Sequence, residues 1–233
     1  MGRGRGAGSR RRWEQMWRSR SPREFAWQAD ELPRELDRLL ESGALPPGAA
    51  LDVGCGAGAA ARRISRSVEA TVGLDVAMAA VGRARDLARR EGAPVRFVVG
   101  EAPELPFADG SFALIFDRGC LQNVPRSRWP AYFERIERLL APGGFFQLFV
   151  IRPALPPALS VAGAKARLRH PRRALGTRKR AARLDGRLRG HVPPSLEVVE
   201  VTDVPVLHGT RRRTFVHLLA RKAGGGRTRP ARI

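Results

Sequence analysis

The feature that most constrains the fold of this 233-residue chain is an apolar run that ends in closely spaced glycines. Residues 49–54 read Ala-Ala-Leu-Asp-Val-Gly, and Gly56 and Gly58 follow just before an alanine-rich stretch. The apolar run predicts a buried strand and the alanine-rich stretch a helix, so the glycines form the turn between them. Because glycine has no Cβ, such a turn lets a ligand approach the backbone closely.

Strand and helix patterns alternate along the rest of the chain. We expect Asp30 to cap the first helix and Gly143-Gly144 to end the last one. The alternation indicates βαβ units, and hence a parallel sheet with helices on both faces. The predicted strands are 49–54, 68–75, 94–101, 109–117 and 145–151, and the predicted helices are 30–43, 58–67, 78–92 and 128–140.

Two further strands are predicted near the end of the chain, at 196–204 and 214–221. The connection between them is too short for a crossover helix, so they should pair antiparallel. The predicted fold is therefore α/β: a Rossmann-like, doubly wound, mostly parallel seven-stranded sheet that ends in an antiparallel hairpin. Dehydrogenase-type sheets normally continue in parallel instead.

Positive charge is strong and uneven: 43 basic against 22 acidic residues give a net charge of +21. The excess lies in residues 1–24, expected to be a basic disordered arm, in an insertion at about 152–192 within a domain spanning 25–233, and in the tail that follows the insertion. Clustered cations favour a nucleic acid or another polyanion. The alternative is a compositional preference for Arg in solvated segments, because only three basic residues are Lys, and no aromatic residue between Arg152 and His191 could stack on bases. Nucleic acid is therefore not the favoured partner.

Cysteine and histidine usage excludes several classes of site. Cys55 and Cys120 make neither a disulfide framework nor a zinc site, and the four histidines show no metal-ligand spacing, so no metal is expected. His217 is expected to be structural, whereas His191 or His208 could reach a pocket. No apolar run approaches the roughly 20 residues of a membrane span. We expect a cytoplasmic protein, and the sequence gives no indication of its oligomeric state.

Two acidic residues beside the glycine turn indicate what it binds. Asp75 ends the second strand, 17 residues after Gly58, where an acid can accept hydrogen bonds from a ribose diol. A nicotinamide dinucleotide has to be weighed, because Gly54-x-Gly56-x-x-Ala59 also fits its fingerprint. However, Asp52 at the strand tip would repel a pyrophosphate and suits a ligand that carries an ammonium and a sulfonium, such as S-adenosylmethionine.

At this point the sequence resembles the class I S-adenosylmethionine-dependent methyltransferases. Their motifs are matched by LDVGCGAG at 51–58, by VGLD at 72–75, by the region 97–124 and by RIERLLAPGGFF at 135–146. The resemblance covers about residues 45–151, and it implies S-adenosylmethionine as cofactor and a small-molecule methyl acceptor. It places the following residues at the cofactor: Asp52, Gly54, Cys55, Gly56, Gly58, Asp75, Val76, Glu101, Ala102, Asp117, Arg118 and Gly119.

Within the class, two features resemble thiopurine S-methyltransferase relatives. They are Asp117-Arg118-Gly119 and an aromatic leader, Trp13-x-x-x-Trp17, with Phe25 and Trp27. In that group the leader helix covers the cofactor, and the Arg borders the acceptor, so sulfur is slightly favoured as the acceptor atom. No catalytic residue is assigned beyond this acceptor-side role for Arg118. The two Trp residues alternatively serve only to pack a helix, and Cys120 is expected to be a buried structural thiol.

The sequence departs from the family pattern at Glu101, which stands where an Asp often faces the adenine amine, and at Ala113, where Asp is usual. Glu keeps the acceptor oxygens but adds a methylene. Two other functions remain open. One is an RNA methyltransferase that binds phosphates through the basic insertion. The other is a basic binding protein that retains a cofactor pocket but transfers nothing.

Overall fold

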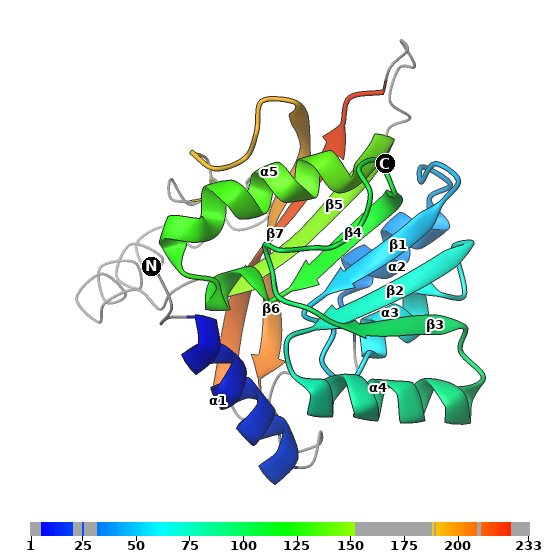
Figure 1. Cartoon of the computed structure of the whole chain (residues 1–233). Helices are drawn as coiled ribbons and strands as arrows, with labels where there is room; N and C mark the ends of the chain where they lie inside the picture. Colours follow the sequence, from blue (N-terminus) through cyan, green and yellow to red (C-terminus); the bar gives the residue numbers. More distant parts are fainter. Residues whose placement is uncertain are drawn as a thin grey trace, which may run out of the picture.

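A single seven-stranded sheet organises the computed structural model, which describes residues 6–20, 25, 32–151, 188, 190–208 and 211–224. The strand order is β3-β2-β1-β4-β5-β7-β6 (Figure 1). The strands are β1 (Ala49–Val53), β2 (Ala70–Asp75), β3 (Val95–Val99), β4 (Phe112–Arg118), β5 (Leu140–Ile151), β6 (Leu196–His208) and β7 (Arg211–Lys222). The helices are α1 (Gly6–Ser19), α2 (Arg34–Glu41), α3 (Ala59–Ile64), α4 (Met78–Glu91) and α5 (Trp129–Leu139), with short 3-10 turns η2 (Leu121–Asn123) and η3 (Arg126–Arg128).

The pairing of the strands confirms the predicted topology. Strands β1 to β5 are mutually parallel, whereas β7 is antiparallel to both β5 and β6. Strand β1 lies between β2 and β4, so the chain winds outward from β1 in one direction and from β4 in the other. Open α/β sheets bind ligands at such a switch point, outside the carboxyl ends of the strands.

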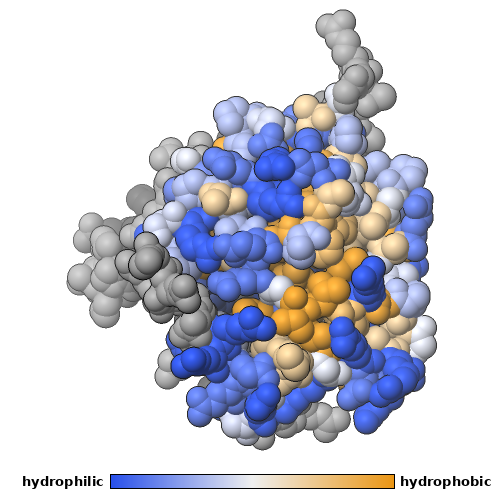
Figure 2. All heavy atoms as spheres, viewed as in Figure 1, coloured by the Kyte–Doolittle hydropathy of each residue, from blue (hydrophilic) through white to orange (hydrophobic). Residues whose placement is uncertain are grey.

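Apolar side chains on both faces of the sheet form the core. On the face turned to the viewer in Figure 1, α5 buries its side chains against β4 and β5. On the opposite face, α2 and α3 pack on β4, β5 and β7, and α4 packs on β3 through Ala84, Ala88 and Phe97. Figure 2 shows apolar side chains gathered in the middle of the near face. Val72 and Val98 are partly buried and pack against the core cluster that contains the buried side chains of α5.

Two predicted helix ends are wrong. Helix α2 begins at Arg34, its N-cap is Pro33 without a side-chain hydrogen bond, and Asp30 lies outside the described residues. Helix α5 ends at Leu139, because Leu140 is already extended and pairs with β4. Gly143 and Gly144 therefore lie inside β5. A Cβ at Gly144 would be 2.9 Å from the carbonyl oxygens of Ala141 and Phe112, so this irregular stretch of the strand requires a glycine.

The predicted disorder of residues 1–24 is also wrong over much of that range. Residues Gly6–Ser19 form α1, and Trp17 is buried with only 2% of its surface exposed. Its ring lies 4.6 Å from that of Phe25, and both pack on alanines of the glycine turn and of α4. Most of the basic insertion (152–187 and 189) lies outside the described residues, as does Trp27.

His217 is structural, as expected. Its ring stacks on Phe149 and lies 3.2 Å from both the Gln147 amide and the Thr202 hydroxyl, and burial lowers its pKa to about 4. His191 packs against Trp129 and Phe133 of α5. Within the described part of the chain, no cluster of side chains could hold a metal ion, and no helix is long and apolar enough to cross a bilayer.

Candidate active site

The glycine turn between β1 and α3 is tied to the end of β2. The amides of Gly54 and Cys55 both donate to the carbonyl of Leu74, at 2.7 and 2.9 Å. Gly54, Gly56 and Gly58 all have positive φ, of 70°, 55° and 77°, a conformation that favours glycine.

Neighbouring side chains impose a second requirement for glycine in this turn. A Cβ at Gly54 would lie 2.7 Å from the Cβ of Cys120, and one at Gly58 would lie 2.6 Å from the ring of Phe97. Sequence reasoning assigned these glycines to a tight turn and to close approach of a ligand. In the structure they also make room for the turn after β4 and for β3. Burial raises the pKa of the Cys120 thiol and of the Cys55 thiol, as expected of structural cysteines.

Asp75, at the end of β2, joins the turn to the start of α4. One carboxylate oxygen accepts from the amide of Gly56 and the other from the amide of Ala77, both at 2.9 Å. Burial raises the pKa of this carboxyl group, and the backbone hydrogen bonds oppose the shift. Each carboxylate oxygen has a second lone pair, so the group still has acceptor capacity for two hydroxyl donors.

Asp52 lies deeper in the same edge of the sheet, with 3% of its surface exposed. It accepts a hydrogen bond of 3.0 Å from the amide of Ala61, in the first turn of α3. Burial raises its pKa to about 7, and the positive charge of Arg118 opposes the shift. The position where a helix N-terminus usually binds an anion is thus taken by the protein's own carboxylate.

Asp117 and Gly119 shape the turn that follows β4. The carboxylate of Asp117 accepts from the amides of Cys120 and Leu121, at 2.7 and 2.9 Å, and from the hydroxyl of Tyr132 at 2.6 Å. Asp117 is fully buried, and burial raises its pKa to about 6. Its side chain thus holds the turn in place. Gly119 has a φ of 90°, and its amide donates to Phe149.

Arg118 ends β4 and places a positive charge at the carboxyl edge of the sheet, near Asp52. Its side chain is partly buried, and burial lowers its pKa, whereas the negative charge of Asp52 raises it. The strand register pairs Val53 with both Leu74 and Asp117. Asp52, Asp75 and Arg118 therefore come from the ends of three adjacent strands, which is the arrangement that the sequence predicted.

Glu101 and Ala102 follow β3 on the loop that leads to β4. Ala102 is buried, whereas the Glu101 side chain is 37% exposed and forms an ion pair of 3.2 Å with Arg128. The same guanidinium pairs with Glu104. Sequence reasoning predicted the location of Glu101 but not its partner, because Arg128 is 27 residues away in the chain.

Helix α1 contributes a residue that sequence reasoning missed. Glu14 accepts a hydrogen bond of 3.2 Å from the amide of Ala79, in the first turn of α4, and pairs with Arg18 at 2.8 Å. Its charge acts on Asp75, whose pKa it helps to raise. The spacing of Trp13 and Trp17 was the signal for this helix. A hollow of about 690 Å³ lies between α1 and Met78, lined also by Arg10, Arg11 and Arg18.

Comparisons with known proteins relate the chain to methyltransferases. Residues 50–144 match the model of a methyltransferase domain family. The chain is 30% identical over 151 residues to 2-heptyl-1-hydroxyquinolin-4(1H)-one methyltransferase of Mycobacteroides abscessus, covering 62% of this chain and 66% of that protein. It is 34% identical over 110 residues to an uncharacterized methyltransferase of Synechocystis, covering 47% of this chain and 50% of the relative. The chain thus spans between half and two thirds of these curated relatives.

Solved structures show the same fold. A TM-score of 0.65, at 20% identity, relates the chain to 1,6-didemethyltoxoflavin-N1-methyltransferase of Burkholderia thailandensis, solved with S-adenosylhomocysteine, over 93% of this chain and 88% of that one. A second solved structure comes from work on the conversion of a disulfide bond into a thioacetal group during echinomycin biosynthesis. Its TM-score is 0.70 at 22% identity, and the match covers 93% of this chain and 94% of that one. The family match over residues 50–144, the topology of the sheet and the carboxylates at the switch point together support a class I S-adenosylmethionine-dependent methyltransferase domain.

Proposed function

We propose that the protein transfers a methyl group from S-adenosylmethionine to a small-molecule acceptor. The observation that carries the proposal is the carboxylate of Asp52 at the first turn of α3. A dinucleotide would place its pyrophosphate there. Moreover, the amides of Gly54, Cys55, Gly56 and Gly58 all donate to acceptors within the protein. These four amides are therefore not available to a phosphate, and the negative charge beside them suits a cationic nucleoside.

The geometry around the turn supports the following proposed roles. Asp75 accepts from the ribose hydroxyls through its remaining lone pairs, and Asp52 lowers the free energy of the bound ammonium. Glu101 and Ala102 lie along the adenine. When bound, S-adenosylmethionine supplies an electrophilic methyl group, so the chain has to align the acceptor and exclude water.

For the acceptor we propose a small molecule, with sulfur favoured over oxygen, nitrogen or carbon. The Mycobacteroides abscessus relative is named for a hydroxyquinolone, a small molecule, which supports the first part. Arg118 supports the second, because a nearby cation lowers the pKa of a thiol and so increases its thiolate fraction.

The test is a screen of thiols, phenols, amines and carbon acids with methyl-labelled S-adenosylmethionine, reading both labelled product and released S-adenosylhomocysteine. We expect turnover with a small acceptor, and a loss of at least 100-fold in Asp75→Ala. Asp86→Asn, on the exposed side of α4, is the matched control and should behave like the wild type. If Arg118→Ala keeps full turnover with a thiol, Arg118 has no role in activating sulfur.

Methyl transfer has to be measured rather than inferred from the fold. A cyclase shares the fold at a TM-score of 0.60 and 22% identity. If the protein binds S-adenosylmethionine tightly but no acceptor in a broad panel releases S-adenosylhomocysteine, the chain is a binding protein that retains the pocket, and the proposed activity is wrong.

A further inference from the structure

The loop between β3 and β4 forms the adenine side of the proposed site, and side chains of another element hold it. Residues 100–111 contain no helix or strand, yet they begin with Glu101 and Ala102. Within the loop the backbone supplies only short-range bonds, such as the amide of Leu105 to the carbonyl of Pro103, and the amides of Gly100 and Gly110 at its two ends donate to the carbonyls of Asp75 and Arg138 at 3.0 and 2.8 Å. The position of Glu101 therefore depends on contacts from outside the loop.

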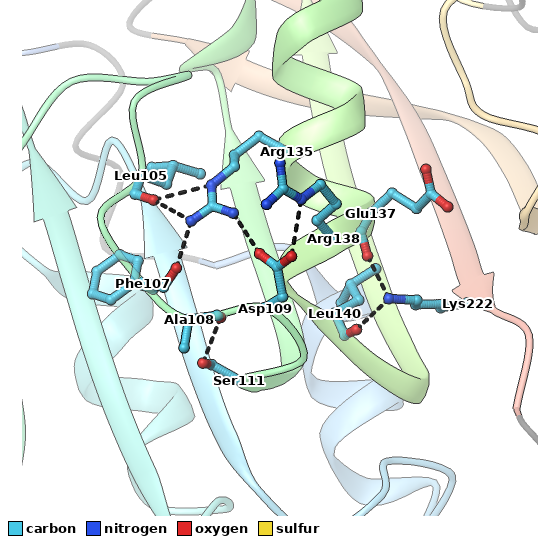
Figure 3. A network of polar contacts seen from close by, with 10 residues as sticks. All are labelled: Leu105, Phe107, Ala108, Asp109, Ser111, Arg135, Glu137, Arg138, Leu140 and Lys222. Atoms are coloured by element: carbon cyan, nitrogen blue, oxygen red, sulfur yellow. Dashed lines mark hydrogen bonds and ion pairs between the residues drawn. The ribbon is translucent and has the colours of Figure 1, made fainter.

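Arg135 of α5 fixes the middle of this loop (Figure 3). Its guanidinium donates to the carbonyl of Leu105 at 3.1 and 2.7 Å and to that of Phe107 at 2.5 Å. It also pairs with Asp109 at 2.7 Å, and Arg138 pairs with the other oxygen of that carboxylate. The loop is thus anchored along α5 up to Leu105, which is itself buried.

Arg128 fixes the beginning of the loop. It is the last residue of η3, directly before α5, and its amide donates to the carbonyl of Pro125 at 2.8 Å. One terminal nitrogen pairs with Oε1 of Glu101 at 3.2 Å and the other with Glu104. A single planar guanidinium therefore connects two acids of the loop to the element that precedes α5.

The exposure of these ion pairs argues against a purely structural role. The Arg128 side chain is 31% exposed, and the side chains of Glu101 and Glu104 are 37% and 64% exposed. Pairs this close to solvent contribute little to folding stability. What the pair does provide is a fixed direction for the Glu101 carboxylate, whose side chain has three rotatable bonds that an unpaired Glu would sample freely.

We propose, on the basis of the function proposed above, that Arg128 is a positioning residue for recognition of the nucleoside base. By holding Glu101 through Oε1, it directs the carboxylate so that it accepts a hydrogen bond from the 6-amino group of adenine. The pair compensates for the extra methylene of Glu at this position. Arg128 thereby sets the preference for adenine over a base that carries a carbonyl oxygen at the same place.

The test compares two ligands on the full chain by calorimetry: S-adenosylhomocysteine and S-inosylhomocysteine, which has a carbonyl in place of the 6-amino group. Because a carbonyl oxygen facing the carboxylate cannot donate, the wild type should prefer the adenosine compound by tenfold or more. In Arg128→Met this preference should fall about tenfold. Arg138→Met is the matched control, because the Arg138 side chain is exposed and pairs with Asp109 rather than with Glu101. In this variant the preference for the adenosine compound should be unchanged.

Further variants exclude a general loss of structure. Arg128→Lys keeps the charge without the planar fork and should give an intermediate preference, and the thermal midpoint of each variant should stay near that of the wild type. In a Glu101→Gln background, Arg128→Met should have no further effect on the preference. A wild-type preference retained in Arg128→Met, or additive effects in the double variant, would overturn the inference. Wild-type binding of both ligands with equal affinity would overturn it while leaving the proposed function intact, and no binding of either would overturn both.

Discussion

Three buried aspartates end adjacent strands, and their hydrogen bonds give each a different task. Asp117 accepts from two backbone amides and a tyrosine hydroxyl and holds a turn, whereas Asp75 accepts from two backbone amides and keeps spare acceptor capacity. Asp52 has one donor, the amide of Ala61, and its pKa is raised to about 7. The sequence predicted where the three carboxylates lie, because strand ends and spacing are visible in it. It could not predict which carboxylate was saturated, since the donors come from η2, α3 and α5.

The pKa of Asp52 predicts how binding depends on pH. Burial favours the protonated form, so this group stabilises the free folded protein at low pH, and the contribution is lost as the pH rises through about 7. A bound ammonium favours the charged form instead, so binding releases a proton. Affinity for S-adenosylmethionine should therefore increase about tenfold from pH 6 to pH 8.

Calorimetry in two buffers of different ionisation enthalpy measures both the affinity and the proton released. Asp52→Asn keeps an acceptor for the Ala61 amide but cannot titrate, so its affinity should be independent of pH. A slope that persists in Asp52→Asn would assign the titration to another group.

At the scale of elements, the glycine turn is shaped by its neighbours as much as by a ligand. Gly54→Ala would place a methyl group 2.7 Å from the Cβ of Cys120, at a φ of 70°. We expect it to lower the free energy of unfolding by about 3 kcal/mol, from overpacking together with backbone strain. Gly92 follows α4 at a φ of 64° and has open space around it, so Gly92→Ala tests backbone strain without overpacking. We expect this variant to lower the free energy of unfolding by about 1 kcal/mol. Urea unfolding of both variants checks this; equal losses would show that Cys120 imposes no constraint.

The helices show where local sequence signals fail. Most strands and α3 and α4 were predicted within a few residues, because apolar runs and capping glycines are local. Residues 1–24 were predicted to be a disordered basic arm, although the spacing of Trp13 and Trp17 within them was also interpreted as a leader helix. The ordered helix α1 packs through Trp17 against Ala57, Ala77 and Ala80, and these distant partners cannot be read from the local sequence. Gly143 and Gly144 were assigned to a helix end, but the pairing of Leu140 with Phe112 places them in a strand.

For the molecule as a whole, the alternation of strands and helices was enough to predict the sheet, and the short final connection predicted the hairpin. The net charge of +21 was a poorer guide to how the basic side chains are used. Many arginines of the described core are engaged in ion pairs or bind carbonyls, as Arg62, Arg63, Arg128 and Arg135 do. Charge counted along the sequence does not reveal these pairings, because the partners lie on other elements.

The central claim is that the carboxylates around the glycine turn bind a cationic nucleoside rather than a dinucleotide. Calorimetric titration of the purified chain with S-adenosylhomocysteine, and separately with NAD, tests it most directly. We expect saturable heat with the first ligand, lost in Asp75→Ala, and none with NAD. Tight binding of NAD by a folded chain that gives no heat with S-adenosylhomocysteine would contradict the account.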